Sequence, residues 1–257
     1  MSNGLLSTVR DLARRRARRR RDLTLAEGIR LVEEVLEADA SIRGIVTAPM
    51  LEASERGRAL KARLARVPGT SVEVTDSELV ELADTEHPQG VIAVVQPPTH
   101  TLEDIAVSVR RPVLVIDRVQ DPGNVGALCR TGWGLGAAGV VALPGTAELF
   151  GPKALRGSMG ALFHLPAVRS DDDALVAWLR RHDIDLWVAT RQGTPVSDVD
   201  FGTSRVALVV GNEGAGPHQA LMQHASATVA VPLAPSVESL NVAVAAGILL
   251  YEVVRER

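Results

Sequence analysis

Short runs of apolar residues recur through the second half of the chain, each bounded by turn residues such as glycine, proline or aspartate. Stretches with helical spacing of apolar positions separate most of these runs. This alternation predicts an α/β fold with a mainly parallel sheet, and such sheets bind ligands at the carboxyl ends of their strands. The predicted strands span residues 113–117, 139–143, 185–190, 205–211 and 227–233.

The first part of the chain carries a smaller α/β pattern. Residues 23–38 have apolar positions near helical spacing and predict a helix, whereas 42–49 and 91–98 predict short buried strands. Consecutive prolines follow Gln96, disfavour a helix there and mark a linker. The expected organisation is a small domain over 1–97, a linker over 98–111 and a larger domain over 112–257.

The longest apolar run lies near the end of the chain, in SVESLNVAVAAGILLYEVV at residues 236–254. It predicts a core helix with Ser236 as its N-cap, because serine accepts hydrogen bonds from the N–H groups of a first helical turn. The run after Asn241 is too short to cross a bilayer, which takes about 20 apolar residues. Ser239 and Asn241 can therefore be helix caps or part of a site.

Composition is typical of a globular protein with a well-buried core, at 257 residues and 46% hydrophobic content. The single cysteine, Cys129, excludes an intrachain disulfide and suits a reducing compartment. The six histidines show no metal-ligand spacing. We therefore expect a cytoplasmic protein with no metal and no membrane partner.

A basic block, RRRARRRR at residues 14–21, stands out in a chain whose net charge is −3. Such blocks commonly contact phosphate backbones, but a solvated helix face or an unstructured tail is an equally good interpretation of the charge pattern alone. Asp11 and Asp22 flank the block, and no apolar stretch precedes a cleavage site, so a transit peptide is disfavoured.

One glycine motif is misleading. Residues 134–139, GLGAAG, fit the GxGxxG fingerprint of dinucleotide-binding proteins. That fingerprint has to follow a strand and open a helix, whereas these glycines follow a helical stretch and lead into a predicted strand. A Rossmann nucleotide site, and with it an oxidoreductase, is therefore disfavoured.

Three other polar loops follow predicted strands, where an open α/β sheet places its ligands. They are DRVQDPGNVGALCRTG at 117–132, GNEGAGP at 211–217 and PLAPSVESLN at 232–241. In the first loop Asn124 is a candidate helix cap, and Arg130 follows one to two helical turns later. Taken singly, each loop is as consistent with a turn and a cap as with a site.

Together the three loops resemble the ordered signature motifs of the SpoU (TrmH-like) branch of the SPOUT methyltransferases. The matching residues are NVGALCRT, GNEGAG and VPLAPSVESLNVA. LAEGIRLVEEVL and HPQGVIAVV also resemble that family's N-terminal L30e-like substrate-binding domain, so the resemblance runs from about residue 23 to 255. On this alignment most of the arginine block lies outside the family pattern.

The resemblance implies a SPOUT fold with a deep trefoil knot, which periodicity alone does not predict because knots are nearly absent from proteins. It also implies S-adenosylmethionine as cofactor, read largely by main-chain groups, with the segment after DLWVAT as a covering loop. The cofactor-binding positions carried over by alignment are Ala189, Thr190, Gly193, Gly211, Val231, Leu233 and Leu240.

The activity implied is methylation of ribose 2′-hydroxyls in RNA, which requires the hydroxyl to be placed in line with the transferred methyl. The positions that correspond to the family's polar residues are Asn124, Arg130, Glu213, Ser239 and Asn241. Arginine stays protonated, so we assign Arg130 to the target phosphate and to the developing alkoxide rather than to proton removal. Cys129 is disfavoured as a nucleophile, since no partner base is evident.

The implied partners are RNA, with ribosomal RNA preferred over transfer RNA, and a second copy of the chain that contributes Arg130 to the first. The expected RNA-binding residues are Arg14, Arg15, Arg18, Arg19 and Arg30. A non-catalytic RNA-binding or ribosome-assembly protein is the alternative, and cofactor binding separates the two.

Overall fold

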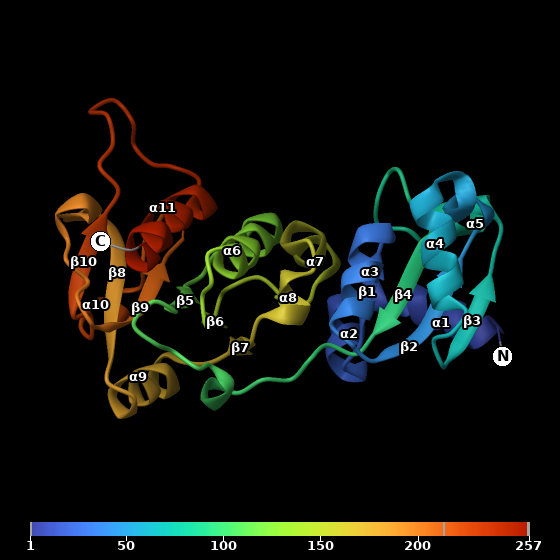
Figure 1. Ribbon diagram of the computed structural model, residues 1–257, viewed down its shortest axis with the longest axis horizontal. Coiled ribbons are helices and arrows are strands. Elements are labelled where there is room, and N and C mark those ends of the chain that lie inside the picture. The colour runs from blue at the N-terminus through green and yellow to red at the C-terminus, as the bar shows by residue number, and fades with distance from the viewer. Residues whose placement is uncertain (1, 213, 256–257) are drawn as a thin grey trace. The chain divides into compact units, whose positions relative to one another are not determined.

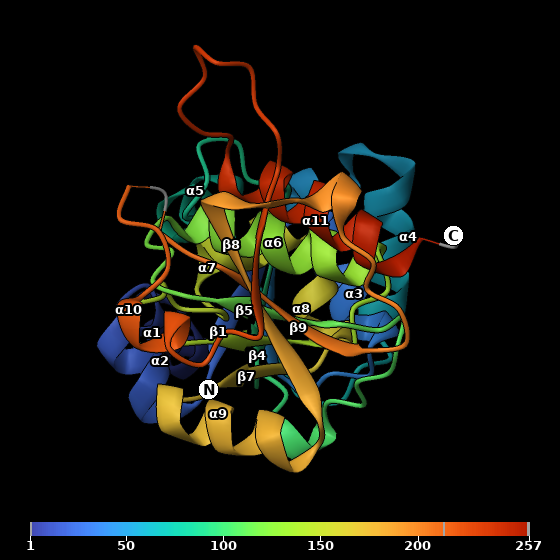
Figure 2. The same cartoon turned by 90° about the vertical axis from the view of Figure 1, so that its left-hand side faces the viewer.

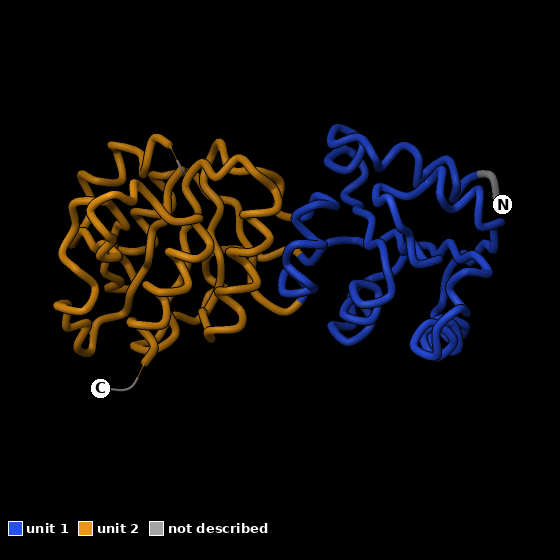
Figure 3. Tube along the Cα trace, turned by 90° about the horizontal axis from the view of Figure 1, so that it is seen from above, with its two compact units in different colours: residues 1–98, 150–163 blue, residues 99–149, 164–257 orange. Residues whose placement is uncertain are grey.

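The computed structural model describes residues 2–212 and 214–255, which form two compact units. The first unit comprises the residues up to 98 together with 150–163, and the second comprises 99–149 and 164 onward (Figure 3). The first unit is therefore discontinuous in sequence, because a segment from the middle of the chain belongs to it.

A four-stranded sheet forms the centre of the first unit, in the order β1-β4-β2-β3. Only β2 and β3 are parallel. The strands are β1 (Thr24–Glu27), β2 (Ile42–Thr47), β3 (Thr70–Glu73) and β4 (Val91–Val95). The helices of residues 2–98 are α1 (Ser2–Leu12), α2 (Arg15–Arg21), α3 (Ile29–Glu37), η1 (Pro49–Ala53), α4 (Glu55–Leu64) and α5 (Asp76–Leu82).

The helix predicted over 23–38 is wrong in its first third. Residues Thr24–Glu27 are the fully buried strand β1, and the helix begins only at Ile29. Gly28 separates the two with φ +96°, a conformation that L side chains rarely adopt. A short apolar run does not by itself distinguish a buried strand from a buried helix, so the pattern merged two elements.

The arginine block forms α2, which excludes the unstructured-tail interpretation. Arg18 turns back to the preceding helix and donates from Nη1 to the carbonyl oxygens of Leu12 and Ala13, at 2.8 and 2.9 Å. Asp11 accepts hydrogen bonds from Arg20 and Arg21, at 3.0 and 2.9 Å. Part of this basic charge is therefore used to hold α1 and α2 together.

The segment of residues 150–163 joins the first unit through specific contacts, and it carries α7 (Pro152–Ser158) and most of α8 (Ala161–His164). The Thr24 hydroxyl donates to the carbonyl oxygen of Phe150 at 2.6 Å. Arg156 binds the carboxylate of Asp84 at 2.7 Å. A side chain at Gly160 would meet Cβ of Glu34 at 2.4 Å, so the segment packs closely on α3.

A six-stranded, wholly parallel sheet forms the second unit, in the order β10-β8-β9-β5-β6-β7 (Figures 1 and 2). This confirms the predicted α/β class and the five predicted strands, and only the three-residue β7 was missed. The strands are β5 (Val113–Ile116), β6 (Gly139–Ala142), β7 (Ala167–Arg169), β8 (Ile184–Pro195), β9 (Arg205–Val210) and β10 (Ala227–Ala230). The helices are η2 (Leu102–Asp104), α6 (Pro122–Gly134), α9 (Asp172–Arg181), η3 (Val196–Asp198), α10 (Gln219–Met222) and α11 (Val242–Val254).

The core of this unit consists of aliphatic side chains on the sheet and on α9, with Trp178 fully buried among them. Residues 98–111, predicted as a linker, contribute Ile105 to this core, at 5% exposure. The glycines of residues 134–139 connect the end of α6 to β6, which is the helix-to-strand context that argues against a dinucleotide fingerprint. No helix among the described residues is long and apolar enough to span a bilayer.

Candidate active site

The first loop leads from β5 into α6, and Asp121 caps that helix. Its carboxylate accepts from the backbone N–H of Asn124 at 2.9 Å, and Pro122 occupies the first helical position. The prediction that Asn124 is the cap is therefore wrong, because Asn124 is the third residue of the helix. Its side chain is half-buried, and Arg130 lies farther along α6 with an exposed side chain.

The third loop leads from β10 into α11, and Asn241 caps that helix. Asn241 Oδ1 accepts from the backbone N–H groups of Ala243 and Val244, at 2.9 and 3.4 Å. Ser236 was the expected cap, but α11 begins at Val242, six residues later. Ser239 is exposed in the loop that precedes the cap.

The two asparagines meet across the loops. Asn241 Nδ2 donates to Asn124 Oδ1 at 2.9 Å, although 117 residues separate them in sequence. The helices at whose N-terminal ends they lie, α6 and α11, also pack against each other (Figure 2). The structure thus brings together two of the three loops selected from sequence, through the polar residues proposed to act there.

Helix α11 is only partly a core helix, contrary to the prediction. Leu249 and Leu250 on one face are buried, whereas Val244, Ile248 and Tyr251 are 52%, 37% and 55% exposed. A groove between α6 and α11 runs along this exposed face. It is lined by Ala127, Thr131, Asn241, Ala243, Val244, Gly247, Ile248 and Tyr251.

The second loop, residues 211–217, is a closed turn at the end of β9. Asn212 and Gly216 form an isolated bridge. A side chain at Gly211 would meet the backbone nitrogen of Pro217 at 2.4 Å, so the two ends of the loop approach closely only because residue 211 is glycine. Glu213, the predicted catalytic carboxylate, lies outside the described residues.

The predicted covering loop after DLWVAT is instead part of a strand, because β8 continues to Pro195. Its pairing with β10 is interrupted: Thr228 lies opposite Val188, but Val229 lies opposite Thr194. Residues 189–193, which include the predicted cofactor positions Ala189, Thr190 and Gly193, fall in this interruption. The prediction missed it because a bulge leaves no mark in apolar periodicity.

Besides Gly211 in the second loop, the other predicted cofactor positions lie between β10 and α11, on a long excursion of the chain (Figure 1). The strand predicted over 227–233 ends at Ala230, so Val231 and Leu233 belong to this loop. Val231 and Leu240 are half-buried, and Leu233 is 37% exposed.

The loops provide a main-chain environment that fits a cofactor read by backbone groups. A side chain at Gly193 would meet the backbone of Val229 at 2.6 Å, just as one at Gly211 would meet the backbone of Pro217. Chain segments thus pass one another at glycine, and their N–H and C=O groups are not screened by side chains. We infer that Gly193, Gly211 and their neighbours can hold S-adenosylmethionine.

Burial distinguishes two neighbouring residues on α6. Burial raises the pKa of the Cys129 thiol to about 12, so the reactive thiolate is not populated at neutral pH. Arg130, in contrast, is exposed, and it makes no ion pair with any other described residue. Its guanidinium is available to bind an anion. No cluster of metal-ligating side chains occurs among the described residues.

The predicted RNA-binding arginines differ in their availability. Arg14, Arg19 and Arg30 are exposed, as is Arg15. Arg18 is half-buried and holds the end of α1, so its role in the fold is established by its two carbonyl contacts.

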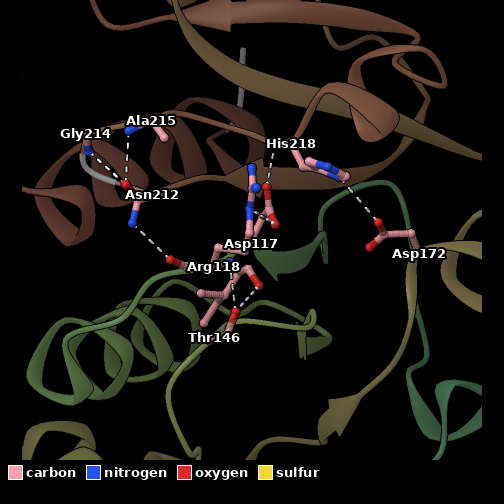
Figure 4. Close-up of polar contacts among 9 residues, drawn as sticks. Asp117, Arg118, Thr146, Asp172, Asn212, Gly214, Ala215 and His218 are labelled. Atoms are coloured by element: carbon pink, nitrogen blue, oxygen red, sulfur yellow. Dashed lines mark hydrogen bonds and ion pairs between the residues drawn. The ribbon is translucent and has the colours of Figure 1, made fainter.

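Two polar residues at the site were missed in the sequence. Asp117 ends the first predicted strand and is buried, at 2% exposure, and Asn212 begins the second loop. Figure 4 shows them on neighbouring strand ends together with Arg118, Thr146 and His218. A charged residue directly after the apolar run VLVI was the signal for Asp117, since a buried carboxylate requires partners.

Comparison with known proteins gives two family matches. Residues 111–251 match the SpoU rRNA Methylase family, and residues 3–93 match the MRM3-like substrate binding domain. The second match contains the whole arginine block, so the expectation that most of the block lies outside the family pattern is wrong.

Similar proteins cover nearly the whole chain. The chain is 35% identical to the 23S rRNA (guanosine(2553)-2′-O)-methyltransferase RlmP of Bacillus subtilis, over 88% of this chain and 86% of that protein. It is 33% identical to the 23S rRNA (uridine(2479)-2′-O)-methyltransferase of Streptomyces viridochromogenes, over 96% and 87%.

Solved structures are similar over both units. The SpoU methyltransferase AviRb of Streptomyces viridochromogenes, in complex with the cofactor AdoMet, has a TM-score of 0.88 and 32% identity, covering 97% of this chain and 96% of that chain. An AdoMet-bound rRNA methyltransferase of Sinorhizobium meliloti has a TM-score of 0.87 and 27% identity, covering 98% and 95%.

Proposed function

The chain belongs to the SpoU rRNA methylase family, and from this membership we propose the RNA that it modifies and the residues that act on it. It is an S-adenosylmethionine-dependent enzyme that methylates ribose 2′-hydroxyls of ribosomal RNA. The non-catalytic alternative is therefore set aside. The proposed substrate is 23S ribosomal RNA in a cytoplasmic enzyme, supported by relatives that match both parts of the chain and act on 23S rRNA.

The test of this substrate uses the full chain, methyl-labelled S-adenosylmethionine and unmodified 23S or transfer RNA. After digestion to nucleosides, mass spectrometry should find a labelled 2′-O-methyl nucleoside from 23S RNA only. Label in transfer RNA alone would contradict the proposed substrate.

The proposed catalytic arrangement begins with the polar loops. S-adenosylmethionine supplies an electrophilic methyl group on its sulfonium sulfur. Asn124 and Asn241 hold the beginnings of α6 and α11 together, which fixes the edge of the sheet where the ribose is bound. Arg130 binds the target phosphate and stabilises the charge that develops on the ribose oxygen. Glu213 and Ser239 complete the polar set.

Replacing Asn241 with aspartate keeps the helix cap but removes the hydrogen bond to Asn124, so it tests the two roles of this side chain separately. Aspartate is an equally good N-cap, so the thermal midpoint should change little. Aspartate cannot donate a hydrogen bond to Asn124 Oδ1, and methyl transfer should fall by about 10-fold, the equivalent of about 1.4 kcal/mol. Thermal melts and single-turnover methyl transfer test this, and wild-type turnover would contradict the role of the contact.

We further propose a homodimer formed through the groove between α6 and α11, in which Arg130 completes the partner's site. Val244, Ile248 and Tyr251 are spaced so that they share one helix face, and their exposure leaves apolar surface in contact with water. Ala127 and Thr131, which line the same groove, flank Arg130 in sequence. A dimer at this groove therefore brings Arg130 close to the second copy. The proposed fold of this domain includes the trefoil knot.

The first unit is proposed to bind RNA through the exposed arginines of the basic block. Replacing Arg14 and Arg19 together with alanine should reduce the dependence of binding on salt, by about 0.7 in the slope of log K against log[salt] for each lost contact with single-stranded RNA. Filter binding over a salt series measures the slope. Arg66→Ala, which removes another exposed arginine of this unit, is the matched control and should leave it unchanged.

A further inference from the structure

Asp117 connects the first and second loops through a buried carboxylate. Its Oδ2 accepts from the backbone N–H of His218 at 2.6 Å, directly after the second loop (Figure 4). Its own backbone N–H donates to the carbonyl of Val210 at 2.9 Å, directly before that loop. One residue at the end of β5 therefore contacts both sides of the loop.

Asn212 makes a second connection, from the loop back to the chain just after β5. Its Nδ2 donates to the carbonyl oxygen of Arg118 at 3.1 Å. Its Oδ1 accepts from the backbone N–H groups of Gly214 and Ala215, both at 3.0 Å. The oxygen of the Asn212 amide thus stabilises the turn, and its nitrogen connects the turn to the chain that follows β5.

Arg118 is itself held in place on the far side. It has φ +54°, an uncommon conformation for a residue other than glycine, and this directs its backbone groups to two neighbours. Its N–H donates to Thr146 Oγ1 at 2.9 Å, and the hydroxyl of Thr146 donates to the carbonyl oxygen of Ile116 at 2.9 Å. The anchor for Asn212 is therefore itself hydrogen-bonded, through Thr146, which is buried at 3% exposure.

We propose that Asp117 and Asn212 are positioning residues that hold the main chain of the second loop in the conformation that binds S-adenosylmethionine. This deepens the proposed function and rests on it, because Gly211 and its neighbours are the proposed cofactor positions. Neither side chain contacts the substrate in this role; both act through the backbone of the described loop residues, 211, 212 and 214–218.

The described residues of the loop have few other attachments to the rest of the unit, which is why these two contacts matter. Its ends approach each other at Gly211 and Pro217, but that approach closes the turn on itself without orienting it on the sheet. The side chain of His218 reaches Asp172, with Nδ1 3.6 Å from Oδ2, on the far side from Asp117. Asp117 and Asn212 instead bind the loop to β5, the strand that leads to Asn124 and Arg130.

The experiment compares three substitutions in the full chain. Asp117→Asn keeps an acceptor for His218 but removes the charge, and Asp117→Ala removes the acceptor. Asn212→Asp keeps the oxygen that shapes the turn and removes the donor to Arg118. Asp172→Asn is the matched control, because it changes an aspartate that touches His218 only through the imidazole. Calorimetry gives the Kd for S-adenosylmethionine, filter binding gives the Kd for 23S RNA, and melts give the thermal midpoint.

We expect the Kd for S-adenosylmethionine to rise about 10-fold in Asn212→Asp, which loses one hydrogen bond. The Kd should also rise in Asp117→Asn, because a hydrogen bond to a neutral acceptor is weaker than one to a charged acceptor. It should rise further in Asp117→Ala, which has no acceptor for the His218 N–H. The Kd for RNA should stay at its wild-type value, which a general loss of folding would not allow, and Asp172→Asn should behave as wild type.

An unchanged cofactor affinity in folded Asp117→Asn and Asn212→Asp would overturn the proposal, as would parallel losses of cofactor and RNA binding. If Asp117→Ala does not fold, the cofactor affinity of Asn212→Asp tests the proposal. This variant should fold, because Asn212 is only half-buried and aspartate has nearly the same shape as asparagine. Wild-type protein that binds the cofactor but methylates no RNA would refute the proposed function, while the affinity comparison would still test the positioning roles.

Discussion

Replacing Arg130 with alanine is expected to abolish methyl transfer while leaving the affinity for S-adenosylmethionine nearly unchanged. The side chain is exposed on α6 and makes no ion pair with another described residue, so its removal leaves no unsatisfied partner among residues 2–212 and 214–255. Loss of a preorganised donor to a developing oxyanion costs about 100- to 1000-fold in turnover. Single-turnover transfer and calorimetric cofactor binding provide the two measurements.

Arg130→Lys is the matched variant for this prediction. Lysine keeps the positive charge but loses the planar fork of donors that suits phosphate, so its rate should lie between those of wild type and Arg130→Ala. Equal losses of cofactor affinity and of turnover in Arg130→Ala would contradict the assigned role, since they would place the arginine at the cofactor.

Replacing Ile248 with aspartate is expected to convert a dimer into an inactive monomer. Ile248 lies on the groove between α6 and α11 and is 37% exposed, so the charge is tolerated in the isolated chain. At an interface between two copies the same charge is buried without a partner, which opposes association strongly. Light scattering gives the mass, and the transfer assay gives activity.

The control is Val80→Asp, which places the same charge at an apolar residue that is 51% exposed on α5 of the first unit. It should leave mass and activity at their wild-type values. A fully active Ile248→Asp monomer would refute both the interface and the contribution of Arg130 to a second copy.

Mixing two impaired variants tests whether Arg130 and Asn241 of one active site come from different subunits. Arg130→Ala should be inactive alone, and Asn241→Ala, which loses both the helix cap and the contact with Asn124, should keep less than about a tenth of wild-type activity. If Arg130 acts on the partner's site, random mixing of the two variants gives heterodimers with one intact site, and activity should recover to about a quarter of wild type. No recovery would place Arg130 and Asn241 in the same subunit's site.

The sequence predicted those features that periodicity encodes. The five apolar runs after residue 112 became β5, β6, β8, β9 and β10, since a parallel sheet covered on both faces requires continuous apolar strands. Asn124 and Asn241 could be chosen because their loops follow predicted strands and together resemble the family motifs, although their direct contact, across 117 residues, is visible only in three dimensions.

Other features depend on contacts that no local pattern records. Asn241 rather than Ser236 caps α11, because a capping preference shared by several polar residues is decided by where the helix begins. The exposed face of α11 was missed for a related reason: an apolar residue that packs inside the chain and one that faces a groove look the same in sequence. The role of Asp117 was missed, although its place after an apolar run marked it as unusual, because its partner is the backbone N–H of His218, 101 residues away in sequence.

The discontinuity of the first unit has a consequence for synthesis on the ribosome. Domains generally fold as they emerge, beginning at the N-terminus. Here β1 and α3 receive their last neighbours from residues 150–163, through Thr24 with Phe150 and the packing of Gly160 on Glu34. The nascent chain therefore completes its N-terminal unit only after more than half of the protein has been translated, and until then β1 lacks part of its cover.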